Sequence, residues 1–326
     1  MTARVFVTGA DGFIGRRVAR GLRERGDEVV AVVRDPEAAT RLRDIGVRLV
    51  PGDLGSDTAI RAAAMDASDA VIHLAGVYRI GIPTSERPAM YEANVEVTER
   101  VLDAAIALGI PRIVHISTVN VFGNTRGRIP DETFRRDPAD GFTSYYDETK
   151  FTAHLRAETR IAAGAPIVIV QPGIVYGAGD HSGAGAQLKA AYDGTVRFVA
   201  FGTMGISPTH VDDIATGIVA ALDRGRLGEA YILTAANLRL SEAMAISARA
   251  AGRRLTRLGA PTAILRLGSR ISPDAGALFG LEPNLREIVT ACDGVTYWGN
   301  SAKAVAELGF DPRPLEVGAR DAFGRP

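Results

Sequence analysis

A glycine-rich segment near the N-terminus constrains the fold more than any other feature of this sequence. It reads Thr-Gly-Ala-Asp-Gly-Phe-Ile-Gly from Thr8 to Gly15, and it joins an apolar run, Arg4–Thr8, to a segment with helical apolar spacing, Phe13–Arg25. At such a junction glycines let main-chain N–H groups approach a phosphate at the helix N-terminus. The spacing is Gly-x-x-Gly-x-x-Gly rather than Gly-x-Gly-x-x-Gly, but its strand-to-helix context predicts a dinucleotide-binding loop. The candidate contacts in this loop are Gly9, Gly12, Phe13, Ile14 and Gly15.

Short apolar runs alternate with helical patterns over the first two thirds of the chain. The runs are continuous rather than alternating, which indicates strands that are covered on both faces. Repeated strand–helix–strand units predict an α/β fold with a parallel, doubly wound sheet of the Rossmann type. The expected strands are Arg4–Thr8, Glu28–Val33, Val47–Val50, Ala70–Leu74, Arg112–Ser117, Ile167–Gln171 and Ala230–Leu233, and the expected helices include Asn94–Leu108 and Tyr145–Ala163.

The alternation breaks down in the C-terminal third, where helical segments are separated by Gly and Pro. We therefore expect a dinucleotide-binding domain over residues 1–176, to which residues 208–235 return. A smaller, mostly helical substrate-binding domain is expected over residues 177–207 and 236–300. Residues 301–326 are expected to form a C-terminal tail.

Charge and composition disfavour several classes of protein. The 38 Lys and Arg residues balance 38 Asp and Glu residues, so the chain lacks the positive surplus of a generic nucleic-acid-binding protein. A single cysteine, Cys292, permits no internal disulfide, and no two histidines have a metal-binding spacing. No apolar run approaches the roughly 18 residues that span a bilayer, and the first residues do not resemble a signal peptide. We expect a cytoplasmic protein with a small-molecule substrate and without metal, nucleic-acid or membrane partners.

The end of the second strand selects the form of the cofactor. An acidic residue there binds a free ribose 2′-hydroxyl, whereas an arginine accommodates a 2′-phosphate. Arg34 comes first and favours NADP, but the adjacent Asp35 leaves NAD open. After the third strand, Asp53 is a candidate contact for the adenine amino group, with Leu54 beside it, although a turn residue is the alternative.

A tyrosine and a lysine are the candidate acid–base pair. Tyr146 and Lys150 lie four residues apart and so share one face of a helix. A neighbouring ammonium favours the phenolate and lowers the phenol pKa, which would let the phenol exchange a proton with an alcohol or carbonyl oxygen. Hydroxyl side chains end the fifth strand, at the sheet edge where ligands bind. The Tyr-x-x-x-Lys spacing alone is common by chance.

Taken together, these segments resemble the extended short-chain dehydrogenase/reductase superfamily from the N-terminus to about Tyr231. The resemblance also rests on His-Leu-Ala-Gly at 73–76, Pro-Gly-Ile-Val-Tyr-Gly at 172–177 and Val-Asp-Asp-Ile-Ala at 211–215. It implies that Thr118 is the catalytic hydroxyl, Tyr146 the acid–base and Lys150 its partner. The further cofactor contacts that it implies are Leu74, Ala75, Gly76, Asn94, the backbone of Ser117, Tyr146, Lys150, Pro172, Gly173, Ile174 and Val175.

Two branches of the superfamily compete. Nucleotide-sugar epimerases and dehydratases usually have asparagine at the position of Ile174, and Arg-Asp where Ile206 and Ser207 stand. The Val-Arg-Asp-Pro after the second strand instead resembles the dihydroflavonol-4-reductase and 3β-hydroxysteroid-dehydrogenase branch, although Gln171 replaces its usual arginine. We therefore expect NADPH-linked reduction of a ketone or aldehyde, or the reverse, on a small, largely uncharged substrate. The alternative is an epimerase or dehydratase with tightly bound NAD. The intact Tyr–Lys pair disfavours a non-catalytic sensor. Membership of the superfamily would also suggest a homodimer.

Overall fold

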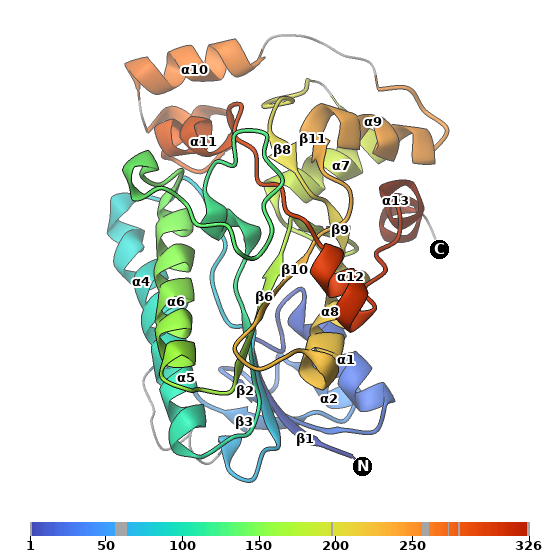
Figure 1. The fold of residues 1–326 in the computed structure, drawn as a ribbon. Helices are drawn as coiled ribbons and strands as arrows, with labels where there is room; N and C mark the ends of the chain where they lie inside the picture. The colour runs from blue at the N-terminus through green and yellow to red at the C-terminus, as the bar shows by residue number, and fades with distance from the viewer. Residues whose placement is uncertain are drawn as a thin grey trace.

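The computed structural model describes residues 2–55, 64–196, 198–255, 261–272, 274–279 and 281–324. Its centre is a seven-stranded sheet with the order β10-β6-β5-β4-β1-β2-β3 (Figure 1). All neighbouring strands in it run parallel. The strands are β1 (Arg4–Thr8), β2 (Glu28–Val33), β3 (Arg48–Pro51), β4 (Ala70–His73), β5 (Ile113–Ile116), β6 (Ile167–Pro172) and β10 (Ala230–Leu233).

This sheet confirms the predicted Rossmann-type fold. All seven expected strands are present, and their ends differ from the predicted ones by no more than one residue. Starting at β3, the order is 3-2-1-4-5-6, with β10 added at the far edge. The order reverses between β1 and β4, and ligands of open parallel sheets bind outside the carboxyl ends of the strands at such a point.

Helices cover both faces of the sheet (Figure 1). On one face, α1 (Gly15–Glu24) and α8 (Val211–Arg224) pack against alternate strand residues such as Val5 and Val168. On the other face, α5 (Val97–Ala107) and α6 (Tyr145–Ala162) pack against residues such as Phe6 and Ile169. These apolar side chains alternate between the two cores because successive strand residues point to opposite faces.

The helical run before α5 begins earlier than predicted and has irregular geometry. It comprises a 3-10 turn at Thr84–Glu86, α4 (Arg87–Tyr91) and a π-helical turn at Glu92–Glu96 that contains Asn94. Helix α1, in contrast, begins at Gly15, two residues after the predicted start. The remaining short elements of this region are α2 (Thr40–Asp44) and the 3-10 turns Val119–Phe122 and Pro138–Asp140.

A second group of elements lies beyond the carboxyl edge of the sheet (Figure 1). Its hydrophobic core joins Tyr176, Leu188 and Met244 to residues after β5, such as Phe122. Two small two-stranded sheets pair β7 with β9 in parallel and β8 with β11 antiparallel. The elements are β7 (Val175–Tyr176), α7 (Gly183–Asp193), β8 (Gly205–Ile206), β9 (Thr209–His210), β11 (Leu238–Arg239), α9 (Leu240–Ala250), α10 (Pro261–Ile271), a 3-10 turn (Ala275–Phe279), α11 (Leu285–Cys292) and α13 (Leu315–Phe323). Helix α12 (Ala302–Leu308) instead packs on α8 and β10, in the same core as Val5 and Val168. In the described ranges, no helix combines the length and apolar character needed to cross a bilayer.

Candidate active site

The glycine-rich loop has the close backbone packing that a phosphate-binding turn requires. Gly9 has φ +65°, and a Cβ built on it would lie 2.8 Å from the backbone nitrogen of Ala75. A Cβ on Gly15 would lie 2.0 Å from the Gly9 carbonyl oxygen. Because both positions exclude a side chain, β1, β4 and α1 meet at van der Waals distance. Gly12 donates its N–H to the Gly9 carbonyl at 3.0 Å and leaves the helix N-terminus open to a ligand.

A buried hydrogen-bond network fixes the ends of β1 and β4 beside this loop. The Thr8 hydroxyl accepts the N–H groups of Leu74 and Ala75, each at 3.1 Å. Its own proton therefore faces His73 Nδ1 at 2.7 Å, and His73 Nε2 faces the Thr98 hydroxyl at 2.9 Å. Burial lowers the pKa of His73 to about 3, so this imidazole is neutral. The network was not predicted from the sequence, although Thr8 directly precedes the first glycine.

Asn94 is the next polar anchor toward the proposed nicotinamide end. Its Oδ1 accepts the Val77 N–H at 2.7 Å, and its Nδ2 donates to the Val77 carbonyl at 3.0 Å and to the Thr149 hydroxyl at 3.0 Å. A Cβ on Gly76 would meet Asn94 Oδ1 at 3.2 Å. The asparagine thereby ties the segment after β4 to α6. Its π-helical turn is a geometry often found at functional sites.

The residues after β2 have different roles. Asp35 Oδ1 accepts the N–H groups of Glu37 at 2.9 Å and Ala38 at 3.1 Å, so this carboxylate caps its own turn. Arg34 is exposed, and its guanidinium has no hydrogen bond or ion pair with any described residue. Of the two, Arg34 makes no such bond, whereas Asp35 is engaged in its own turn through Oδ1.

Asp53 and Leu54 follow β3. Asp53 Oδ1 accepts the Gly55 N–H at 2.6 Å, which makes Asp53 a turn residue whatever else it binds. Leu54 is partly buried against the core beneath α5.

The predicted catalytic residues come together at the carboxyl edge of β5. Ser144 caps α6 by accepting the Asp147 N–H at 3.1 Å, and Tyr146 and Lys150 then face the sheet, each 8% exposed. The Thr118 side chain lies near enough to the Tyr146 phenol to lower its pKa, while the Thr118 hydroxyl is within 3.3 Å of Asn120 Oδ1 and 3.5 Å of the Pro172 carbonyl. Lys150 Nζ donates to the Ile116 carbonyl at 2.9 Å, which holds the ammonium against the end of β5.

The two hydroxyls after β5 point to different neighbours. Ser117 Oγ lies 3.0 Å from His154 Nδ1 and is occupied there. Thr118 has extended backbone and caps the 3-10 turn, with its hydroxyl 3.5 Å from the Pro172 carbonyl. Of the two, Thr118 is therefore the hydroxyl that lies beside Tyr146.

The pKa of the Tyr146 phenol is raised, whereas the sequence predicted that it would be lowered. Burial raises the pKa of Tyr146, the nearby Tyr78 adds to this effect, and the Thr118 side chain opposes it. The expected lowering by an ammonium is absent because desolvation of the phenolate dominates. Burial also lowers the pKa of Lys150 to about 8. At neutral pH the phenol therefore keeps its proton and can act as an acid.

Tyr78 was not among the predicted site residues. Its ring packs edge-on against Tyr146, with 4.8 Å between centroids and an interplanar angle of 88°. Its side chain is nevertheless half-exposed, so it borders the space in front of the catalytic phenol. Tyr78 does not belong to a short sequence motif. Its position follows from the hydrogen bonds between Asn94 and the neighbouring Val77.

The segment after β6 passes beside Thr118. Gly173 donates its N–H to the Leu233 carbonyl at 3.1 Å, and a Cβ there would lie 2.6 Å from the Ser207 carbonyl oxygen. The Ile174 carbonyl accepts the Thr209 N–H at 2.8 Å. These bonds hold Pro172 and the three residues that follow it at the carboxyl edge of the sheet, where the nicotinamide is expected.

The positions that would anchor a nucleotide-sugar diphosphate are apolar or already bonded. Ile206 is fully buried in the second core. Ser207 is also fully buried, and its hydroxyl donates to Asn237 Oδ1. Arg197 is a basic residue that would be an alternative anchor for such a diphosphate, and it lies outside the described residues.

Comparison with known proteins places the chain in a family. The model of the NAD-dependent epimerase/dehydratase family matches residues 5–234. A Stigmatella aurantiaca protein named 4-hydroxy-2-methyl-3-oxo-4-farnesyl-3,4-dihydroquinoline-1-oxide ketoreductase is 31% identical over 231 residues, which is 71% of this chain and 68% of that one. A Synechocystis sp. protein named "Putative dihydroflavonol 4-reductase" is 27% identical over 97% of this chain and 92% of that one.

Solved structures share the fold over almost the whole chain. The crystal structure of gox2253 has a TM-score of 0.82 and 30% identity, covering 98% of this chain and 97% of that one. UDP-glucuronic acid 4-epimerase from Bacillus cereus, solved with UDP-glucuronic acid and NAD, has a TM-score of 0.76 at 20% identity, covering 98% of both chains. The chain therefore belongs to the NAD-dependent epimerase/dehydratase family, and it is an NAD(P)-dependent oxidoreductase of the extended short-chain dehydrogenase/reductase type.

Proposed function

We propose that the chain catalyses the NADPH-linked reduction of a ketone or aldehyde, or the reverse oxidation of an alcohol, on a small, largely uncharged substrate. One observation carries this proposal: Thr118, Tyr146 and Lys150 are buried together at the carboxyl end of β5, with Lys150 one helical turn after Tyr146 and bonded to the Ile116 carbonyl. An acid and a second hydroxyl then converge where a carbonyl oxygen would lie. The reduction direction suits a tyrosine whose pKa burial has raised.

The protein residues divide the work of reduction among them. When bound, the cofactor supplies a hydride from nicotinamide C4 to the carbonyl carbon. Tyr146 gives its phenolic proton to the carbonyl oxygen as the carbon–oxygen double bond becomes a single bond. Thr118 donates a hydrogen bond to the same oxygen and orients it. The ammonium of Lys150, fixed by the Ile116 carbonyl, stabilises the phenolate that remains.

NADP is proposed as the preferred form of the cofactor. Support comes from the free guanidinium of Arg34 and from the use of Asp35 within its own turn. An arginine at this place accommodates a 2′-phosphate, whereas an acid committed to two main-chain N–H groups is less available to a ribose hydroxyl.

The preference for an uncharged substrate is supported by the positions around the proposed substrate space. Ile174, Ile206 and the bonded Ser207 offer no charge to a diphosphate. Arg79 lies near Tyr78, but Glu282 and Glu86 both pair with it. The names of the two relatives also refer to ketone reduction, whereas the similarity to the sugar-nucleotide epimerase extends to the fold alone.

Whether the purified protein retains or exchanges its cofactor distinguishes the proposed reductase from an epimerase or dehydratase. The purified protein would be denatured and the released nucleotide identified by mass spectrometry, and the native protein would be titrated with NADPH and NADH. We expect little retained nucleotide, tighter binding of NADPH, and NADPH consumption with uncharged ketones or aldehydes. Tightly retained NAD together with turnover of UDP-glucose would instead identify an epimerase or dehydratase.

A further inference from the structure

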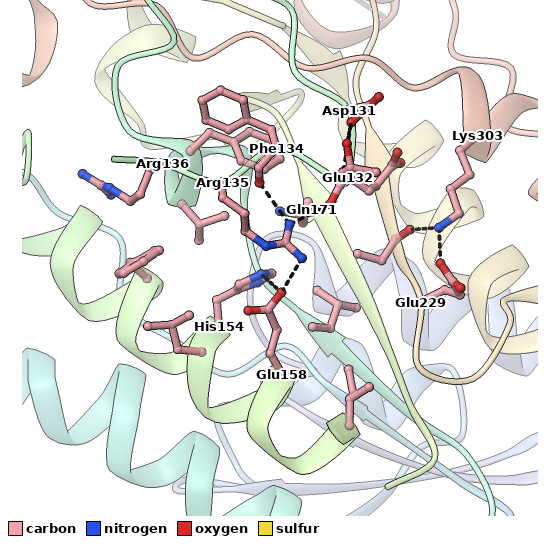
Figure 2. Close-up of a pocket in the computed structure, with 18 of the residues that line it drawn as sticks. Asp131, Glu132, Phe134, Arg135, Arg136, His154, Glu158, Gln171, Glu229 and Lys303 are labelled. Carbon is pink, nitrogen blue, oxygen red and sulfur yellow. Dashed lines mark hydrogen bonds and ion pairs between the residues drawn. The ribbon is translucent and has the colours of Figure 1, made fainter. Parts of the chain in front are cut away.

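A cavity of about 920 Å³ lies beside α6, between this helix and the edge of the sheet formed by β6 and β10 (Figure 2). Its floor is the face of β6 and β10, at Ile169, Gln171 and Ala230. Its walls come from α6 and from the segment between the 3-10 turn Val119–Phe122 and α6. Tyr146, Lys150 and Thr118 do not line this cavity.

The cavity follows from the way helices cover the sheet. On the face that α5 and α6 cover, the apolar core includes β6 residues as far as Ile169. The neighbouring edge strand β10 has a different cover: Glu132 reaches over it and accepts the Ile232 N–H at 2.9 Å. A loop thus replaces a helix over this edge and leaves space above Gln171 and Ala230.

Several charged side chains around the cavity are paired with one another, whereas the carboxylates of Asp131 and Glu132 are bonded to Thr133 and to the Ile232 N–H. Glu158 lies 3.4 Å from Arg135 and 3.5 Å from His154, on one side of the cavity in Figure 2. On the other side, Lys303 Nζ donates to Glu229 at 2.7 Å. These pairs leave little net charge for an ionic ligand.

A third ion pair holds the remaining cation of the lining. Arg136 is bonded to the buried Asp147 at 2.8 Å. The only other positive groups among the described lining residues are Arg135 and Lys303, which the pairs above already hold. An anionic ligand would therefore find no free cation in this part of the cavity.

Gln171 is the exception among these polar groups. Its residue is only 1% exposed, and its side chain, on the same strand face as Ile169, lines the cavity. The carboxamide makes no hydrogen bond with any described residue. It therefore presents unmet N–H donors and a carbonyl acceptor from the floor. The amide is open to the cavity rather than sealed in the core, so a complementary group in the cavity would pair with it.

We propose that this cavity is a second small-molecule site, which binds an uncharged ligand with an apolar body and a group that both donates and accepts a hydrogen bond, such as a secondary amide. The amide would pair with the Gln171 carboxamide. The apolar body would lie against Phe134, Phe151 and Leu155, which line the walls. The volume is within the range of small-ligand sites. This proposal does not depend on the reductase activity.

Fluorine NMR with para-fluoroacetanilide as the probe tests the site on the full chain, with and without saturating NADP. Line broadening is expected at a dissociation constant on the order of 1–10 mM, which is typical of so small a ligand. NADP should not displace the probe. The matched anion para-fluorophenylacetate should bind at least about tenfold more weakly, because the cations of the lining are paired.

Three variants test whether the probe binds in this cavity. Gln171→Leu keeps a side chain of similar size and should weaken acetanilide binding by about tenfold, since two hydrogen bonds are lost. Leu155→Trp should reduce the space in the cavity and weaken binding as well. Tyr146→Phe, which lies outside the cavity, should leave binding unchanged. No broadening at 10 mM probe, equal binding by Gln171→Leu, or displacement by NADP would each overturn the proposal.

Discussion

Alanine substitution of the loop glycines separates their role in folding from their proposed role in cofactor binding. At Gly9 the left-handed backbone costs an alanine roughly 1–2 kcal/mol. The new Cβ would also lie 2.8 Å from the Ala75 nitrogen, an overpacking worth about 1–3 kcal/mol. Gly9→Ala should therefore lower the free energy of unfolding by about 2–5 kcal/mol.

Gly12 should respond differently. Its φ is not in the left-handed region, and an added Cβ would meet only the Gly9 carbonyl oxygen, at 3.0 Å. We expect Gly12→Ala to cost at most about 1 kcal/mol of stability. Its methyl group would nevertheless stand where the pyrophosphate is expected. Losing one charge-assisted hydrogen bond, about 1.5–3 kcal/mol, would weaken NADPH binding roughly 10- to 100-fold.

Gly21, inside α1, is the matched control, because a Cβ there meets no atom within 4 Å. Gly21→Ala should stabilise the protein by about 0.5–1 kcal/mol and leave NADPH affinity unchanged. Urea unfolding followed by the fluorescence of Trp298, the single tryptophan, gives the stabilities, and titration gives the affinities. Wild-type stability in Gly9→Ala, or wild-type NADPH affinity in Gly12→Ala, would refute the reasoning.

Three further predictions concern charged groups. Because the Lys150 pKa is lowered to about 8, the ammonium is lost above that pH. We therefore expect kcat/KM for reduction to fall as the pH rises through about 8. A flat profile to pH 9.5 would contradict a role of the Lys150 ammonium in reduction. Arg34→Ala should weaken NADPH binding more than NADH binding in parallel titrations, and equal losses would exclude a contact with the 2′-phosphate. Arg136→Leu strands the fully buried Asp147 carboxylate and should cost about 3–5 kcal/mol in urea unfolding, part of which Asp147→Asn in the same chain should restore.

The sheet could be predicted from the sequence because each of its strands is recognisable from a short stretch of neighbouring residues. Runs such as Ile167–Val170 are continuously apolar, and a short apolar run bounded by proline indicates a strand that is covered on both faces. The start of the helix near Asn94 was placed too late, since a π-helical turn at Glu92–Glu96 changes the apolar spacing that predicts helices.

The candidate site was predicted by residue type and spacing, but its electrostatics were not. The direction of the Tyr146 pKa shift was wrong because it depends on burial by distant segments, Tyr78 among them. The choice between Arg34 and Asp35 needed the hydrogen bonds of the turn. The cavity above Gln171 depends on how a loop and α6 cover the sheet edge, and no local pattern encodes that.

Transfer of hydride in a single turnover tests the central assignment most directly. Tyr146→Phe and wild type would be mixed with NADPH and an uncharged ketone that wild type reduces, and loss of NADPH absorbance would be followed. Removing the general acid should slow the step by about 10²- to 10⁴-fold, while NADPH affinity stays within about twofold of wild type. Hydride transfer by Tyr146→Phe at the wild-type rate would show that this tyrosine is not the proton donor.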